Sequence, residues 1–156
     1  MIIRKSRQTK KDINILATLD HELSKELYDL SIYWEESFPS EKVSTRWISK
    51  AIYDKSLSFY IAEIDRKPIG MICISFRELK YAQTIFIVCL YVLSESRNKK
   101  VATSLIEKVE LIAKKNRANA ISLDVSKKNK LAIQLYKKFG FESDSFHMLK
   151  RLSVQP

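Results

Sequence analysis

The 156-residue sequence is poor in glycine, proline, cysteine and histidine, and each shortage narrows the classes of protein it can represent. Two glycines and three prolines argue against a collagen-like repeat, a Gly-rich linker or a low-complexity segment. Two cysteines and two histidines argue against a disulfide framework and against a metal site. Because Cys73 and Cys89 each lie inside an apolar run, we expect reduced thiols in a cytoplasmic protein.

Long apolar runs are also absent. The longest, from Ile85 to Leu93, has nine residues, whereas a membrane-spanning helix needs about 20. Charged residues follow the first three residues with no apolar core behind them, so we expect neither a signal peptide nor a membrane partner. The length and the 46% of hydrophobic residues are typical of one folded domain, which we expect over residues 1–156.

Positive charge is abundant but uneven. The net charge is +10, yet residues 1–96 carry 14 basic and 13 acidic side chains, whereas residues 97–156 carry 14 basic and five acidic ones. Residues 20–41 hold seven acids against one base, Lys25. A basic half attracts anionic ligands and an acidic segment attracts cations. Solvated helix faces would explain the same composition, and that interpretation stays open.

The hydrophobic pattern predicts strands and helices in alternation. We expect an α/β protein with a mixed, mostly antiparallel central sheet of about six to seven strands and helices on both faces. Strands are predicted at Ile2–Lys5, Ser58–Ile64, Pro68–Phe76, Thr84–Val92, Ala120–Val125 and Phe146–Leu152. Helices are predicted at Lys11–Tyr33, Glu41–Tyr53, Val101–Asn116 and Lys130–Phe139.

The strand at 84–92, the helix at 101–116 and the strand at 120–125 read as a βαβ unit with parallel strands. The polar loop between the first two elements carries Arg97, Lys99 and Lys100. Unpaired N–H groups and the helix dipole make the start of a helix a natural anion site. An ordinary strand-to-helix turn with solvated lysines would fit this pattern equally well.

Two motifs make the pattern more specific. The first is the segment at residues 90–106, LYVLSESRNKKVATSLI, and the second is N-x-x-A-x-x-x-Y-x-x-x-G-F from Asn129 to Phe141. Together they resemble the acetyl-CoA-binding signature of the GCN5-related N-acetyltransferase (GNAT) superfamily. The resemblance extends over nearly the whole chain and implies an N-acetyltransferase that uses acetyl-CoA and no metal.

One residue departs from that signature. The family loop reads Arg/Gln-x-x-Gly-x-Gly/Ala, and here Lys100 stands at the first glycine while Ala102 fits the pattern. Glycine permits a positive φ and a close approach to the diphosphate, and lysine loses both advantages. If the position requires a positive φ, lysine costs about 1–2 kcal/mol there.

The resemblance assigns roles to named residues. The backbone of Leu90 and Val92 would bind the pantetheine arm, and the N–H of Leu90 would donate to the thioester oxygen, a catalytic role. Tyr136 would be the catalytic acid toward the departing thiolate, or else an aromatic side chain of the core. The residues assigned to the cofactor are Leu90, Tyr91, Val92, Arg97, Asn98, Lys99, Lys100, Val101, Ala102, Thr103, Asn129 and Tyr136.

The acceptor side is less defined. In this family it lies over the first two helices, where Trp34, Glu35 and Glu36 favour a cationic amine, either a small molecule or a peptide. No acid stands on the strand at 84–92, so the general base is sought among Glu35, Glu36, Glu63 and Glu78, each of which is also an ordinary surface carboxylate. Cys89 is interpreted as a small core residue.

Three functions remain open from the sequence. The first is acetyl transfer to a primary amine by direct attack in a ternary complex. The second is a non-catalytic acyl-CoA-binding or regulatory protein, which the lysine at position 100 and the absence of an obvious base would suit. The third is an acetyltransferase with an RNA-linked acceptor, although no aromatic-interleaved basic motif supports nucleic-acid binding. A homodimer also stays open.

Overall fold

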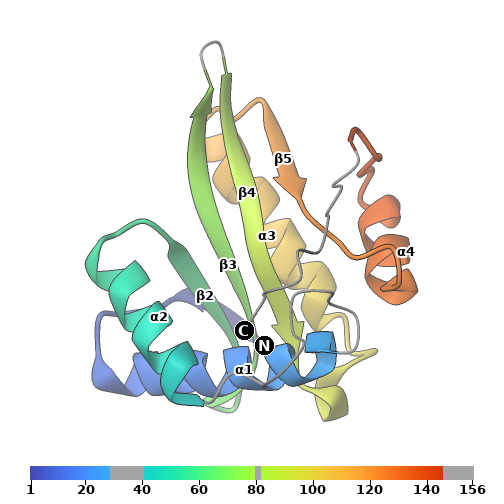
Figure 1. Cartoon of the computed structure of the whole chain (residues 1–156). Coiled ribbons are helices and arrows are strands. Elements are labelled where there is room, and N and C mark those ends of the chain that lie inside the picture. Colours follow the sequence, from blue (N-terminus) through green and yellow to red (C-terminus); the bar gives the residue numbers. More distant parts are fainter. Residues whose placement is uncertain (29–40, 80–81, 146–156) are drawn as a thin grey trace, which may run out of the picture.

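A mixed sheet with helices on both faces makes up the described part of the protein (Figure 1). This computed structural model describes residues 1–28, 41–79 and 82–145. The strands lie in the order β1-β2-β3-β4-β5. The elements are β1 (Ile2–Lys5), α1 (Lys10–Tyr28), α2 (Glu41–Tyr53), β2 (Ser58–Ile64), β3 (Lys67–Leu79), β4 (Ala82–Val92), a 3₁₀ turn (Ser94–Ser96), α3 (Val101–Lys115), β5 (Ala120–Leu123) and α4 (Lys130–Lys138).

The predicted fold class is confirmed, with a smaller strand count. The described residues form five strands rather than six or seven, and the strand predicted at 146–152 lies outside them. β1, β2, β3 and β4 pair antiparallel in sequence order, and β4 pairs parallel with β5, as the βαβ pattern predicted. β5 ends two residues earlier than expected, and the loop after β4 contains a 3₁₀ turn.

Each face of the sheet has its own apolar core. On one face α3 packs on the sheet through Val101, Leu105 and Val109, which contact Ile72 and Ile85 in one cluster. Helices α1 and α2 cover the other face and form a second apolar cluster with it. The buried residues of this cluster are Leu16, Ala17, Leu19, Ile48, Ala51, Ile52, Phe59, Ile61, Met71, Cys73 and Tyr91. Apolar residues at helical spacing in α1 and α2 produce this second layer.

A buried ion pair fastens the first strand to this layer. Arg4 donates to both carboxylate oxygens of Asp12 at 2.7 and 2.8 Å, and to Glu63 at 2.8 and 3.0 Å. Asp12 also accepts the Arg7 N–H at 2.6 Å and is only 3% exposed. The Arg4 hydrogen bonds hold the pKa of Asp12 below its usual range. One guanidinium thus joins β1, α1 and β2.

Candidate active site

The second half of β4 has an open edge. β5 pairs with β4 only from Thr84 to Ile87, and Figure 1 shows β4 running on past the end of β5. A β-bulge falls at the same place, because Cys89 pairs with Cys73 while Ile87 pairs with Ile74, which leaves Val88 as the extra residue. Beyond Ile87, no described strand therefore lies beside β4 on the β5 side.

The backbone of Leu90 and Val92 faces this open edge. The N–H of Leu93 donates to the carbonyl of Ile69 in β3 at 3.0 Å. Since hydrogen-bonded and non-hydrogen-bonded pairs alternate along an antiparallel ladder, Tyr91 also turns its backbone groups toward β3. Leu90 and Val92 then turn theirs away from β3. This is the arrangement that binding of an extended pantetheine arm requires.

The loop after β4 presents a series of backbone donors. Asn98 and Lys100 have φ values of 61° and 60°, so two residues in the left-handed region alternate with Lys99. No hydrogen bond to the N–H groups of Asn98, Lys99 or Lys100 occurs within the described residues. The first turn of α3 adds three N–H groups that a helix leaves without internal partners. This combination is typical of a backbone cradle for phosphate.

Lys100 has the positive φ that the sequence comparison with the family loop raised as a possibility. It is the N-cap of α3 with φ 60° and ψ 15°, and its side chain makes no capping hydrogen bond. Glycine would adopt this conformation without strain, whereas for lysine the conformation costs about 1–2 kcal/mol of stability. The loop nevertheless has the left-handed backbone at this position.

Arg97 makes contacts that the sequence did not reveal. Its Nη2 donates to both oxygens of Glu26 in α1 at 2.5 and 2.6 Å, and its Nε donates to the carbonyl of Val92 at 3.1 Å. Tyr91 donates its hydroxyl to the same carboxylate at 3.2 Å. The side chain of Arg97 is thus engaged within the protein, and of the backbone groups of Val92 only the N–H remains for a ligand at the open edge.

The second motif lies on and before α4, beside β5 in Figure 1. Asn129 is the N-cap of α4, and its Oδ1 accepts the N–H of Ala132 at 3.1 Å. Tyr136 is partly buried and meets the ring of Phe141 edge to face, with 5.6 Å between ring centroids. Burial, with a smaller contribution from Cys89, raises the pKa of Tyr136 to about 12. The helix itself has no buried residue.

Two groups near β4 have raised pKa values, the Cys73 thiol and the Tyr136 phenol. Cys73 is fully buried opposite Cys89, and burial together with the Cys89 thiol and the Asp20 carboxylate raises the pKa of Cys73. Cys89 in turn acts on Tyr136. Cys89, interpreted from the sequence as a small core residue, is partly buried and packs against the core cluster under α1 and α2. Asp20 is the α1 carboxylate that contributes to the shift of Cys73.

Asp20 was not among the general-base candidates drawn from the sequence. Burial raises its pKa, although a hydrogen bond from the Ser44 hydroxyl and the nearby His21 oppose the shift. Within the described residues no salt bridge involves Asp20. The signal was available in its spacing, because Asp20 interrupts an apolar stripe formed by Ile13, Leu16, Leu23 and Leu27.

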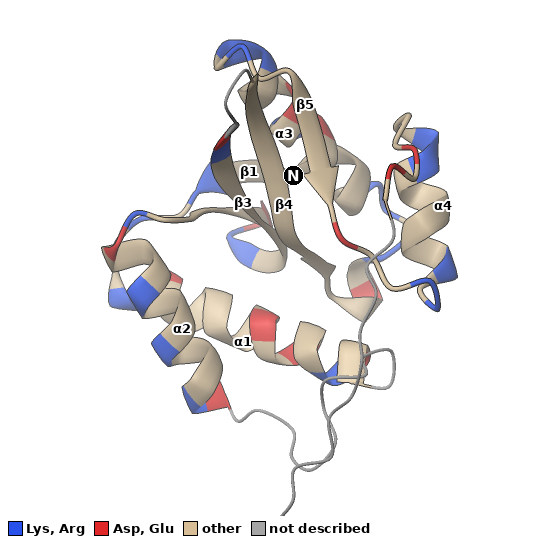
Figure 2. Cartoon of the chain, turned by 45° about the horizontal axis from the view of Figure 1, so that its top comes forward, with Lys and Arg blue, Asp and Glu red and all other residues tan. Residues whose placement is uncertain are grey.

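The described base candidates from the sequence lie elsewhere. Glu63 is bonded to Arg4, and Glu78 is exposed near the end of β3 away from the open edge. Trp34, Glu35 and Glu36 lie outside the described residues. Figure 2 marks acidic residues along α1 and basic residues at both ends of α4. On α1, Glu22 pairs with Lys25 and Glu26 with Arg97, whereas Asp20 has no salt bridge among the described residues.

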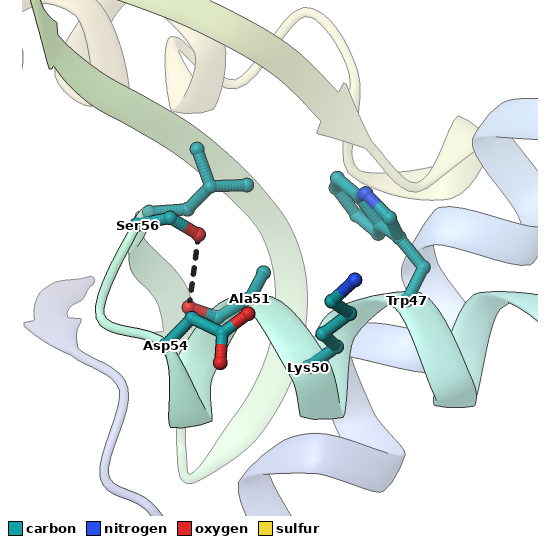
Figure 3. Close-up of a pocket in the computed structure, with 6 residues that line it drawn as sticks. Trp47, Lys50, Ala51, Asp54 and Ser56 are labelled. Atoms are coloured by element: carbon teal, nitrogen blue, oxygen red, sulfur yellow. Dashed lines mark hydrogen bonds between the residues drawn. The ribbon is translucent and has the colours of Figure 1, made fainter.

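A shallow pocket of about 280 Å³ lies apart from these residues, where α2 meets β2 (Figure 3). Trp47, Lys50 and Asp54 line it, and Ser56 donates to the carbonyl of Ala51 at 3.4 Å. None of its lining residues belongs to the predicted donor site. The described residues hold no group of three or more potential metal-ligating side chains, and none of their helices is long and apolar enough to span a membrane.

Comparison with known proteins places this geometry in context. The model of the acetyltransferase (GNAT) family matches residues 21–141. A curated relative, an uncharacterised N-acetyltransferase of Methanocaldococcus jannaschii, is 27% identical over 128 residues. That match covers 76% of this chain, and the chain spans only 57% of the length of that relative.

Solved structures agree over the full length of the fold. A possible acetyltransferase from Clostridium difficile superposes with a TM-score of 0.81 at 18% identity, covering 99% of this chain and 98% of that one. A protein of Clostridium acetobutylicum, described as a predicted acetyltransferase with acetyl-CoA, has a TM-score of 0.72 at 26% identity. That match covers 96% of this chain and 95% of the other.

Proposed function

The chain belongs to the acetyltransferase (GNAT) family, and from this premise we propose that it transfers the acetyl group of acetyl-CoA to a primary amine. The observation that carries the proposal is the open edge of β4, followed by a loop in which the N–H groups of residues 98–100 have no hydrogen-bond partner among the described residues. The reaction is direct attack of the amine in a ternary complex. The acceptor is a cationic amine, either a small molecule or a peptide.

The described residues fit acetyl-CoA, which supplies an acetyl group activated as a thioester. Leu90 and Val92 would bind the pantetheine arm through their outward backbone groups. The N–H groups from Asn98 to Thr103 would bind the diphosphate, and Lys99 and Lys100 would add positive charge beside it. The N–H of Leu90 would stabilise negative charge developing on the acetyl oxygen.

Tyr136 contributes to the reaction as a hydrogen-bond donor. With a pKa of about 12, its phenol stays protonated at neutral pH. Complete proton transfer to a thiolate, whose conjugate thiol ordinarily titrates near 8.5, would be uphill by about three pKa units. The structure therefore favours a hydrogen bond from Tyr136 that stabilises the departing thiolate over full protonation of the sulfur by this residue.

Asp20 is our candidate for the group that receives the ammonium and accepts its proton. A protonated amine has no lone pair for attack, so its proton must be removed directly or through water. Asp20 lies on α1, and its carboxylate contributes to the raised pKa of Cys73 in β3. Its raised pKa makes it a better proton acceptor than an ordinary aspartate.

Thermal unfolding with and without acetyl-CoA tests the donor site first. At 100 times Kd a ligand adds about 2.7 kcal/mol of stability, which is a Tm increase of about 5–10 °C for a chain of this size. ATP and dephospho-CoA serve as controls. Absence of a shift at millimolar acetyl-CoA would contradict the proposed function.

Thiol release from acetyl-CoA then identifies the acceptor. We expect turnover with polycationic amines, such as a polyamine, an aminoglycoside-like sugar or a basic peptide, and little with neutral amines. Tight binding of acetyl-CoA without turnover on any of these amines would instead indicate an acyl-CoA-binding protein that is not a catalyst.

A further inference from the structure

Arg97 is held from two sides at the point where β4 becomes the phosphate loop. On one side its Nη2 donates to both carboxylate oxygens of Glu26, at 2.5 and 2.6 Å. On the other side its Nε donates to the carbonyl of Val92 at 3.1 Å. Two of the three guanidinium nitrogens are thereby engaged, which restricts the orientation of the guanidinium plane.

Tyr91 reinforces the same contact. Its hydroxyl donates to Oε1 of Glu26 at 3.2 Å, and its ring lies 5.8 Å from the Arg97 guanidinium carbon. The Tyr91 residue is only 4% exposed and belongs to the core cluster under α1. Glu26 therefore accepts hydrogen bonds from a buried strand residue and from a loop residue 71 positions further along the chain.

The other hydrogen bonds at the start of the loop, among the described residues, are local ones, including that from the Ser96 N–H to the carbonyl of Leu93 at 2.8 Å. The N–H of Arg97 donates to the carbonyl of Ser94 at the long distance of 3.3 Å, and Lys99 Nζ donates to the carbonyl of Glu95 at 3.0 Å. The two left-handed residues, Asn98 and Lys100, follow Arg97 at once. Fixing Arg97 therefore restricts the directions in which the next N–H groups point, and a pre-ordered loop pays less entropy when it binds a ligand.

We propose that Glu26 is a positioning residue of the donor site, which acts through Arg97 to set the phosphate-binding loop. Glu26 stands on α1, on the acceptor side of the sheet, so the contact also connects the two halves of the active site. The inference rests on the proposed function, because it concerns the same acetyl-CoA site.

For Glu26→Gln, the change in charge and the loss of the positioning contact should change the affinity for a diphosphate ligand in opposite directions. Removing a carboxylate near the loop makes the surroundings more positive, which alone would strengthen the binding of a diphosphate. Losing the contact of Arg97 with both carboxylate oxygens of Glu26 makes Arg97 and the loop less ordered. This loss of order weakens the binding of the diphosphate. A weaker affinity in this variant therefore reports the positioning role. Glu22→Gln is the matched control, because it removes the same charge one turn earlier on α1, where Lys25 is the ion-pair partner of the carboxylate among the described residues.

Isothermal titration with two probes tests the proposal. Acetyl-CoA is the first probe, and 3′-phosphoadenosine 5′-diphosphate, the diphosphate-bearing half of the donor, is the second. For Glu26→Gln we expect Kd to rise about fivefold for both probes, in line with the strength of a networked surface ion pair. Glu22→Gln should keep Kd within about twofold of the wild-type value. Tyr91→Phe, which leaves all charges in place, should produce a smaller rise for both probes.

The outcomes separate the two proposals. An affinity of Glu26→Gln equal to that of Glu22→Gln, or tighter than that of the wild type, would overturn the positioning role while the proposed function stands. A loss seen with acetyl-CoA but not with the diphosphate fragment would overturn it too, because the effect would then lie on the pantetheine arm. A wild-type protein that binds neither probe would overturn the proposed function itself. If Glu26→Gln unfolds, Tyr91→Phe decides alone.

Discussion

Two residues of this protein are in environments that lower the stability of the folded state. Lys100 adopts a left-handed backbone in which glycine is at ease, and Asp20 keeps a partly buried carboxylate at the edge of an apolar stripe. Both lie at the proposed active site. Strain and unfavourable burial persist at functional sites when surrounding structure holds them there, so each residue can be tested for what its removal does to stability and to activity.

Replacing Lys100 by glycine should stabilise the fold. Relief of the left-handed strain is worth about 1–2 kcal/mol, from which the greater freedom of glycine in the unfolded chain subtracts about 0.4–1 kcal/mol. We expect a net gain of about 0.5–1 kcal/mol in urea unfolding. Lys99→Gly removes the same charge at a position without positive φ and should not stabilise. Equal effects of the two substitutions would argue against strain at Lys100.

Replacing Asp20 by asparagine should stabilise the fold at neutral pH and impair the reaction. The native pKa of Asp20 is raised, so the charged carboxylate is disfavoured in the folded state once the pH exceeds that pKa. The advantage of the variant should therefore grow as pH rises through the native pKa and vanish below about pH 3.9.

Activity provides the other half of the Asp20 test. Loss of a general base typically lowers the rate by a factor of about 100 or more, so kcat should fall at least that far in Asp20→Asn. Asp54→Asn, at the end of α2, is the control and should change neither quantity. A variant that is more stable but fully active would show that Asp20 is not the proton acceptor.

At the scale of elements, the close approach of β3 and β4 shapes the open edge. A Cβ on Gly70 would lie 2.7 Å from the carbonyl oxygen of Tyr91 and 3.4 Å from the Cα of Val92. Both are backbone atoms of β4, so no side chain can swing away to make room. Gly70 thus sets how closely the two strands lie at the end of β4 that would hold the pantetheine arm.

Gly70→Ala should therefore destabilise the fold by about 1–3 kcal/mol and also weaken acetyl-CoA binding. Urea unfolding and titration measure the two effects. Gly140→Ala is a useful contrast, because no atom lies within 4 Å of the added methyl group, although φ is +79°. It should cost about 1–2 kcal/mol through the backbone alone and leave acetyl-CoA affinity unchanged. An unchanged affinity in Gly70→Ala would remove the link between strand spacing and the donor site.

The sequence predicted local elements well and long-range contacts poorly. The bounds of β1 and α2 match the prediction, because turn residues and apolar spacing are read along one segment. The bulge at Val88 and the pairing of Glu26 with Arg97 did not follow from any local pattern. They depend on strand register and on helix placement, which tertiary packing decides. Asp20 could have been found from its place on the apolar stripe, whereas its neighbours could not.

At the scale of the whole molecule, the ion pairs of Arg4 join three elements distant in sequence. Arg4→Met should leave Asp12 and Glu63 without their shared cation and destabilise the fold by about 3 kcal/mol at pH 7. Glu41→Gln, which removes an exposed charge but keeps an oxygen that can accept the hydrogen bond from Thr18, should cost well under 1 kcal/mol. Urea unfolding of both variants measures the difference. Similar small losses in the two would show that the buried ion pairs contribute little.

The same ion pairs predict a pH dependence. The native pKa of Asp12 is lowered, so its contribution is fully present above the ordinary value of about 3.9 and is lost as pH falls through the native pKa. Wild-type stability should therefore decline in this acid range more steeply than that of Arg4→Met. Parallel acid profiles of the two proteins would contradict the assignment.

The exposed setting of α4 has a consequence for the motions of the protein. Every residue of this helix keeps some contact with solvent, whereas five residues of α3 are buried. Helices with few buried contacts open locally long before a whole domain unfolds. Amide protons of α4 should exchange with deuterated solvent far sooner than those of α3, and a bound donor that packs against α4 should slow that exchange. Tyr136 would then be held firmly in its working position only once acetyl-CoA is bound.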